Sequence, residues 1–202
     1  MKMKITALIT CLFYFVTVCY SQHHSVNTLN QHSNESFGYA DSVNTGLIIK
    51  DTLKGSVQRT AMLTIGGCHL HIKYGSPGVR GRVIWGGLVP YNEVWVTGAH
   101  NATSMSASKP FRIGSMTLSA GTYAIFTIPG KDQWTFIINK NIDQHLADDY
   151  KQAEDLVRII VLPQAHGMTQ RLTYAITDLG HNSGTISIRW ENLSIFVPFE
   201  TL

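Results

Sequence analysis

The chain has 202 residues, 44% of them hydrophobic and 14% charged, and its formal net charge at pH 7 is +3. This length leaves room for one domain of ordinary size together with appendages. The charge balance is nearly even and forms no basic stripe, so composition gives no electrostatic case for a nucleic-acid partner.

The first 21 residues have the pattern of a secretory signal peptide. Lys2 and Lys4 precede an apolar run over residues 5–18, and cleavage is expected after Ser21. The run has about 14 residues, fewer than the ~20 that span a bilayer, so no stable membrane span is expected after cleavage. We therefore expect an exported protein, either periplasmic or secreted.

Residues 22–56 are expected to form a polar, flexible leader, because Ser, Asn, His and Thr dominate and no apolar period is sustained. Residues 57–202 are expected to form the folded domain. Signal cleavage would leave Cys68 as the one cysteine of the three, which excludes an intramolecular disulfide. The simplest interpretation of Cys68 is a buried small hydrophobic residue, with a catalytic thiol as the alternative.

Short β-like runs separated by turn residues fill the domain and predict an all-β fold, a single antiparallel β-sandwich with one short helix. The helix is expected over residues 142–152, with Asp143 as its N-cap. The expected strands are residues 60–65, 69–74, 82–85, 93–97, 103–107, 111–113, 122–128, 134–139, 156–162, 171–177, 185–190 and 195–199.

Alternation predicts which strand faces are buried. Ile186, Ile188 and Trp190 share one face of their strand, so that strand is expected to be half-buried. Residues 156–162 are apolar on both faces except at Arg158. This pattern favours a central strand in which Arg158 needs an acidic partner, and a solvated strand end is the alternative. The candidate partners are Asp149, Glu154 and Asp155.

Residues 74–103 concentrate glycine, arginine and aromatic side chains, which is unusual for strands that only cover a core. If extended, Arg80 and Arg82 point the same way, and two guanidinium groups on one face suit a carboxylate or phosphate. A solvated edge is the alternative. The candidate ligand-binding residues are Arg80, Arg82, Tyr91, Trp95 and His100. An aromatic platform for a flat ligand would use Trp85, Tyr91, Trp95 and Trp134, of which at least two are expected in the core.

A second set of residues has the chemistry of a metal site. His69 and His71 alternate in a strand, so both imidazoles project from one face, and imidazole suits divalent transition metals. Further ligands would come from His100 and from His145 with Asp149, which share one face if residues 142–152 are helical. The alternative is that each of these histidines is a hydrogen-bonded structural residue.

Five motifs in order resemble a known family: SPGVRGRVIWGGLVPY, VWVTGAHNAT, LSAGTYAIFTIPG, WTFIINKN and EDLVRIIV. They are similar to the secreted bacterial proteins of the domain-of-unknown-function family 2911 (DUF2911). The resemblance implies an exported, mostly β domain of bacteria with an outer membrane, and it implies no activity. The commoner family form of the second motif resembles WRTGANEAT, so Val96, His100 and Asn101 stand here in place of Arg, Asn and Glu.

Three hypotheses on function follow, and whether the protein is an enzyme is left open. The first is a module of the cell envelope that binds a small polar ligand or a glycan. The second is a metal-dependent, hydrolase-like enzyme that uses the histidine and aspartate set. The third is a structural role in envelope assembly. The first is preferred, because a sandwich fold supports many functions and the sequence contains no G-x-S-x-G, P-loop, HExxH or dinucleotide glycine motif.

Overall fold

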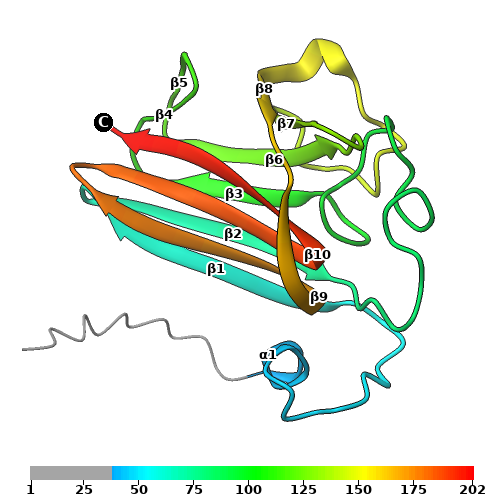
Figure 1. The fold of residues 1–202 in the computed structure, drawn as a ribbon. Helices are drawn as coiled ribbons and strands as arrows, with labels where there is room; N and C mark the ends of the chain where they lie inside the picture. The colour runs from blue at the N-terminus through cyan, green and yellow to red at the C-terminus, as the bar shows by residue number, and fades with distance from the viewer. Residues whose placement is uncertain (1–37) are drawn as a thin grey trace, which may run out of the picture. The chain divides into compact units, whose positions relative to one another are not determined.

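The structure is a computed structural model, and it describes residues 38–202 (Figure 1). The expected signal peptide and the leader up to residue 37 lie outside the described residues. Within them, the predicted all-β fold is confirmed: two antiparallel sheets are accompanied by one short α-helix. Residues 38–202 contain no helix with the length and apolar character needed to cross a membrane.

One sheet has six strands in the order β1-β2-β3-β6-β7-β8, and the other has four in the order β5-β4-β10-β9. The elements are α1 (Tyr39–Asn44), β1 (Val57–Ile65), β2 (Cys68–Ser76), β3 (Thr103–Ala107), β4 (Phe111–Ile113), β5 (Met116–Leu118), β6 (Gly121–Ile128), β7 (Trp134–Asn139), the 3-10 helix η1 (Gln152–Glu154), β8 (Asp155–Val161), β9 (Gln164–Gly180) and β10 (Ser183–Thr201).

The turn between β1 and β2 shows how local sequence sets the register. Ile65 pairs with Cys68, so only Gly66 and Gly67 form the turn, and both have positive φ (56° and 73°). Two-residue hairpin turns of this kind match the right-handed twist of the strands, and glycine adopts them without a Cβ clash. A Cβ on Gly66 would in addition lie 2.5 Å from Thr201 Oγ1.

The main core lies between the two sheets and confirms the predicted alternation in β10. Ile186, Ile188 and Trp190 are 1–3% exposed and pack against residues of the six-stranded sheet such as Ile72. Cys68 is fully buried in the same core, as predicted for a small hydrophobic residue. A smaller apolar cluster on the other face of the six-stranded sheet is formed by Val96, Ala102, Ala124, Phe126 and Ile137.

Two predicted strands, residues 82–85 and 93–97, are wrong: both stretches are turns and bends with isolated bridges at Trp85 and Trp95. Residues 185–190 and 195–199 belong to the single strand β10. Glu191 adopts φ of 54° where the pairing with β9 shifts, so the strand bends at a bulge and continues.

The helix predicted over residues 142–152 is not formed. Asn141 Oδ1 accepts a hydrogen bond from the Asp143 amide, which draws this backbone away from a helical ladder. Leu146 then adopts φ of 53°, which interrupts any right-handed helix. The described helix is α1 instead, which lies in the segment where a flexible leader was expected.

The prediction that residues 156–162 form a central strand is also wrong, because β8 lies at an edge of its sheet. Arg158 donates to Asp155 Oδ2 at 2.6 Å and to Tyr150 Oη at 2.9 Å, so Asp155 is its partner among the three candidates. Burial and the hydrogen bond to Asp155 raise the pKa of Tyr150 to about 12, which keeps this phenol protonated.

Candidate functional site

The connection between β2 and β3, residues 77–102, is the longest described stretch without regular structure, and it is held in place by its backbone. Its start pairs with β9, since the Val79 amide donates to Gln170 O at 2.7 Å and the Leu172 amide to Pro77 O at 3.0 Å. Trp95 exchanges two backbone hydrogen bonds with Thr127 of β6. Long ordered loops of this kind are usually functional, and Figure 1 shows this one as the green loop beside the yellow connection between β7 and β8.

Strained backbone is concentrated in and next to this loop. Arg80, Thr97 and His100 have φ of 47°, 51° and 67°, and Leu146 has φ of 53°. Positive φ is uncommon for any residue other than glycine, and for a β-branched threonine it is a genuine outlier. Such strain persists only where the surroundings hold it, and it clusters at ligand sites.

The contacts that hold Thr97 are buried. Its carbonyl oxygen accepts from Tyr174 Oη at 2.8 Å and from Thr103 Oγ1 at 3.2 Å, and its hydroxyl lies 3.0 Å from Thr127 Oγ1. Burial raises the pKa of Tyr174 well above its ordinary value, so its hydroxyl stays a donor. The two sheets therefore fix the loop immediately before Gly98, Ala99 and His100.

Four tryptophans form one cluster, and two of them, Trp85 and Trp95, belong to the loop itself. Trp95 stacks on Trp190 with ring centroids 5.7 Å apart and planes 19° apart, and Trp85 meets both of them edge-on. Trp134 is 2% exposed and belongs to the core, while Trp85 and Trp95 are partly buried. Aromatic clusters of this kind are rigid, so Trp95 can present a fixed apolar surface to a ligand.

A pocket with a volume of about 280 Å³ lies against this cluster. Four chain segments and two single residues contribute to it: residues 54–56, three stretches of the long loop, Leu146 of the β7–β8 connection and Trp190 of β10. It is lined by Lys54, Gly55, Ser56, Pro77, Gly78, Arg80, Arg82, Leu88, Val89, Trp95, Val96, Gly98, Ala99, His100, Leu146 and Trp190.

The polar side chains of this pocket are almost all hydrogen-bond donors. Lys54, Arg80 and Arg82 are cationic and have no acceptor atom, and His100 adds an imidazole. Among the described lining residues there is no Asp, Glu, Asn or Gln, so no side-chain carboxylate or carboxamide lines the pocket. This lining is suited to a ligand that accepts hydrogen bonds and carries negative charge.

The two arginines differ in how firmly they are held. Arg82 donates to the carbonyl oxygens of Val79, at 3.2 Å, and Gly78, so its side chain also closes the turn behind it. Its pKa is lowered by partial burial and by the charges of Arg80 and Arg171, which is the direction expected for crowded cations. Arg80 is exposed and makes one weaker bond, 3.3 Å to Leu53 O, so its guanidinium is freer to meet a ligand.

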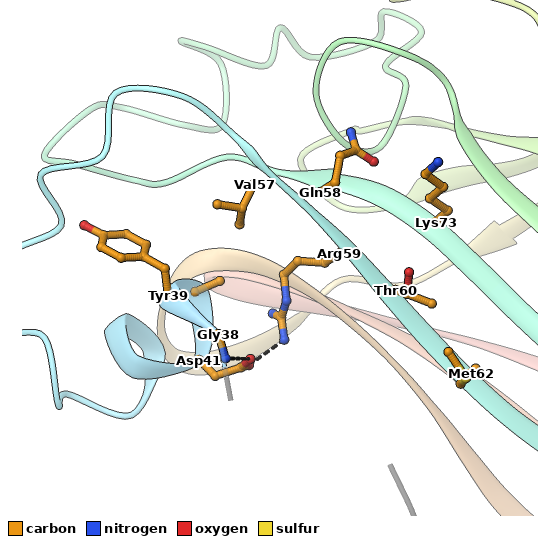
Figure 2. Close-up of a pocket in the computed structure, with 10 residues that line it drawn as sticks. Gly38, Tyr39, Asp41, Val57, Gln58, Arg59, Thr60, Met62 and Lys73 are labelled. Carbon is orange, nitrogen blue, oxygen red and sulfur yellow. Dashed lines mark hydrogen bonds and ion pairs between the residues drawn. The ribbon is translucent and has the colours of Figure 1, made fainter. Parts of the chain in front are cut away.

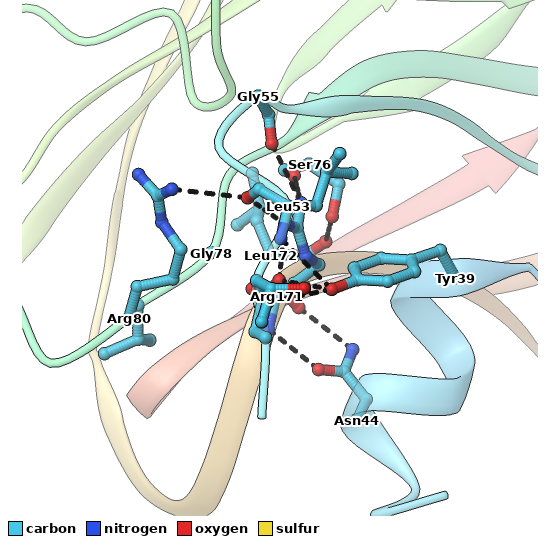
Figure 3. A network of polar contacts seen from close by, with 12 residues as sticks. Tyr39, Asn44, Leu53, Gly55, Ser76, Gly78, Arg80, Arg171 and Leu172 are labelled. Atoms are coloured by element: carbon cyan, nitrogen blue, oxygen red, sulfur yellow. Dashed lines mark hydrogen bonds and ion pairs between the residues drawn. The ribbon is translucent and has the colours of Figure 1, made fainter. Parts of the chain in front are cut away.

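Arg171 anchors the pocket wall formed by Lys54, Gly55 and Ser56. It is fully buried and donates to Asp51 Oδ1 at 2.8 Å and to the carbonyl oxygens of Leu53, Gly55 and Ser76 at 2.9–3.2 Å (Figure 3). The Tyr39 ring of α1 lies 5.1 Å from its guanidinium carbon. A buried charge is tolerated only when it is paired and hydrogen-bonded, and Arg171 meets both conditions.

Asp51 is the anionic partner in this anchor, and its side chain is 5% exposed. Burial by itself raises the pKa of Asp51, but hydrogen bonds from Arg171 and Tyr39 together with the Arg171 charge outweigh burial and lower it. Asp51 is therefore ionised at neutral pH and neutralises Arg171, which leaves the cations of the pocket wall without an acidic neighbour in the lining.

A second cavity, of about 440 Å³, lies between α1 and β1 (Figure 2). Its charges are mixed, because Arg59 is paired with Asp41 at 2.5 Å across the cavity wall and Lys73 stands on the neighbouring strand. None of the residues predicted to bind a ligand or a metal lines it. We therefore take the pocket at the tryptophan cluster as the candidate site.

The structure brings together four of the five residues predicted to bind a ligand: Arg80, Arg82, Trp95 and His100 all line this pocket. The arginines do so from a turn and not from the expected extended strand. Tyr91 does not line it. Its ring lies over Gly86, where a Cβ would come 2.7 Å from Tyr91 Cε2.

The five residues predicted to bind a metal are not gathered at one place. His69 and His71 lie near the start of β2, whereas the loop next to His100 contacts Gly75, since a Cβ there would lie 2.4 Å from Ala99 O. At ~3.3 Å per residue, the six strand steps from His69 to Gly75 span roughly 20 Å and the four from His71 roughly 13 Å. Among residues 38–202 no group of three or more His, Cys, Asp or Glu side chains is placed to hold a metal ion.

His100 and His145 nevertheless lie on two backbone segments that are hydrogen-bonded to each other. Asn101 and His145 form an isolated bridge, and the Leu146 amide donates to His100 O at 2.7 Å. Because no helix forms here, His145 is not aligned with Asp149 as expected. Its Nδ1 lies 4.0 Å from Asp148 Oδ2, and both of these side chains are more than half exposed.

Sequence reasoning missed several residues of the site, above all Lys54, Leu146, Arg171 and Trp190. Arg171 alternates with Leu172 and Tyr174 along β9, so the pattern places it on the outer face. In the structure, residues 51–55 cover that face and bury the guanidinium. No local signal in the sequence indicates this cover, because the two segments are more than 100 residues apart.

The fold and the site thus define an all-β protein of two antiparallel sheets with a basic pocket that is lined in part by tryptophan side chains. Residues 56–199 match the family model described as protein of unknown function (DUF2911), and the chain belongs to that family. Comparison with curated proteins and with solved structures gave no match.

Proposed function

We propose that this protein is an exported binding module whose pocket at the tryptophan cluster holds a small anionic ligand. The observation that carries the proposal is the donor-rich lining: Lys54, Arg80, Arg82 and His100 face a volume of about 280 Å³ that no acidic or amide side chain lines. Carboxylate and phosphate oxygens are the acceptors that paired arginines bind best.

A neutral glycan fits this lining less well. Sugar hydroxyl groups donate as well as accept hydrogen bonds, and a donor left without an acceptor in a desolvated site is costly. The pocket offers the Ser56 hydroxyl and the His100 imidazole as its side-chain acceptors. We therefore prefer an anion to a neutral sugar as the small polar ligand.

The direct test is isothermal titration calorimetry of the purified protein with inorganic phosphate, acetate and glucose, beside the variant Arg80→Gln. Among the described residues Arg80 makes one weak hydrogen bond, 3.3 Å to Leu53 O, so the variant is expected to fold normally. Loss of one charge-assisted contact is expected to weaken anion binding about tenfold or more.

The matched control is Arg112→Gln, which removes the same charge from an exposed ion pair with Glu200, outside the pocket. Its anion affinity should stay close to that of the wild type. Equal weakening by both variants would mean that net charge and not the pocket attracts the anion. Binding of glucose in preference to both anions would overturn the proposal.

A further inference from the structure

The lining of the pocket contains two chemically distinct parts. One part is cationic and is formed by Lys54, Arg80, Arg82 and His100, as described above. The other part is apolar and is formed by Leu88, Val89, Trp95, Val96, Leu146 and Trp190. A bare inorganic anion would use only the first part, because it has no surface that gains from contact with the second.

Two of the apolar side chains of the pocket are also partly exposed to solvent. Leu88 is 46% exposed and Leu146 is 41% exposed. Leu146 is also held in a left-handed backbone conformation, which costs free energy that folding alone does not require. Exposed apolar surface beside strained backbone is typical of a surface that a ligand covers.

Trp190 supplies a second, independent observation. It lines the pocket and is 1% exposed, yet its indole N–H has no hydrogen-bond acceptor among the described residues. Its stacking partner Trp95 donates instead to Gly98 O at 3.1 Å. Trp85 and Trp134 share the unpaired state of Trp190, but neither lines this pocket. Buried donors in folded proteins are nearly always hydrogen-bonded, so the unpaired N–H of Trp190 needs an explanation, and an acceptor atom of a ligand would supply one.

The volume limits the size of the ligand. About 280 Å³ corresponds to roughly nine water molecules at ~30 Å³ each, hence to a ligand of about ten non-hydrogen atoms. A single acidic group on one six-membered ring has this size, and the flat ring suits the face of Trp95.

We infer that the ligand is an amphipathic anion: one carboxylate or phosphate group attached to a flat apolar ring. The inference rests on the proposed function and deepens it by naming the ligand class. The acidic group binds the guanidinium of Arg80 and its cationic neighbours, and the ring covers Trp95, Leu88 and Leu146. The ligand's oxygens also offer acceptors to the many donors of this site.

The test is a matched set of probes measured by calorimetry on the purified protein. Phenyl phosphate is compared with inorganic phosphate and benzoate with acetate, so that a ring is added to phosphate in the first pair and replaces a methyl group in the second. Benzamide has the ring of benzoate without its charge. We expect each ring-bearing anion to bind at least tenfold tighter than its small partner, and benzamide to bind far more weakly than benzoate.

Two leucine variants separate the ring from the acidic group. Leu88→Ser removes apolar surface in the pocket and should weaken phenyl phosphate about fivefold while leaving inorganic phosphate unchanged. Leu179→Ser removes a leucine that is 60% exposed and outside the pocket, and it should change neither affinity. Arg80→Gln should weaken both probes.

The outcomes distinguish the inference from the function on which it rests. If inorganic phosphate and acetate bind as tightly as their ring-bearing partners, the inference is overturned and the anion-binding function stands. If benzamide binds as tightly as benzoate, the charge is irrelevant and both are overturned. If none of the five probes binds, both are overturned as well.

Discussion

At the scale of single residues, the site is marked by side chains in conformations that their chemistry does not favour. Thr97 is β-branched, buried and left-handed, and two hydrogen bonds to its carbonyl oxygen hold it there. Leu146 is left-handed and almost half exposed, with its amide bonded to His100 O. In both cases the backbone conformation costs free energy close to the pocket: Leu146 lines it, and Thr97 directly precedes Gly98, which lines it.

Leu146→Gly is therefore expected to stabilise the fold while it weakens the site. Glycine adopts φ of 53° without the Cβ clash, so the free energy of unfolding should rise by about 1 kcal/mol, while affinity for phenyl phosphate falls. Urea unfolding and calorimetry measure the two effects.

The matched control is Leu179→Gly, in the extended strand β9, where glycine should lower the free energy of unfolding by about 0.5–1 kcal/mol. A loss of stability in both variants would show that the backbone at Leu146 is not strained.

At the scale of elements, the pocket depends on a contact between the segment that precedes β1 and strand β9. Arg171 of β9 and Asn44 of α1 hold the segment that carries Lys54 against the sheets, since Asn44 Nδ2 donates to Arg171 O at 3.0 Å and Asn44 Oδ1 accepts from its amide at 2.7 Å (Figure 3). The segment contributes one wall of the pocket and has no strand of its own, so its position follows from these side-chain bonds.

Arg171→Met is expected to cost about 3–5 kcal/mol in the free energy of unfolding, because Asp51 and three carbonyl oxygens lose their buried partner. Urea denaturation measures the loss.

In the control Arg158→Met, Asp155 keeps its hydrogen bonds from Asn139 and Tyr150, so the expected loss is about 1 kcal/mol or less. Similar losses in the two variants would contradict the anchoring role that we assign to Arg171.

At the scale of the whole molecule, two sheets form a scaffold on which the loops build the pocket. The long β2–β3 connection is fastened to β9, to β6 and to the β7–β8 connection by backbone hydrogen bonds, so its residues keep fixed positions without regular structure. A sandwich fold does not determine a ligand, and in such scaffolds binding residues lie disproportionately on loops.

Export is a property of the whole chain, and we propose it on the pattern of residues 1–21. Expression of the full chain in a Gram-negative host, followed by N-terminal sequencing of the protein from the periplasmic fraction, should give Gln22 as the first residue. The control replaces Ile9 and Leu12 with aspartate, which interrupts the apolar run and should leave unprocessed protein in the cell. Recovery of wild-type chains that still begin with Met1 would contradict a cleaved signal peptide.

The sequence by itself determined the fold class and part of the pocket's chemistry. Period-two alternation identifies buried faces such as that of Ile186, Ile188 and Trp190, because side chains of a strand point alternately to either side. The density of glycine, arginine and tryptophan in residues 74–103 identified four residues that line the site. These signals are local, and a single sequence displays them directly.

Only the tertiary structure decided what surrounds those residues. The burial of Arg171 and the place of Lys54 depend on segments far apart in sequence, and no pattern within either segment encodes the other. The edge position of β8 depends on strand order, and apolar composition does not reveal that order. The helix expected over residues 142–152 failed for a related reason, since side-chain hydrogen bonds and packing against the loop at His100 outweighed weak helix propensity.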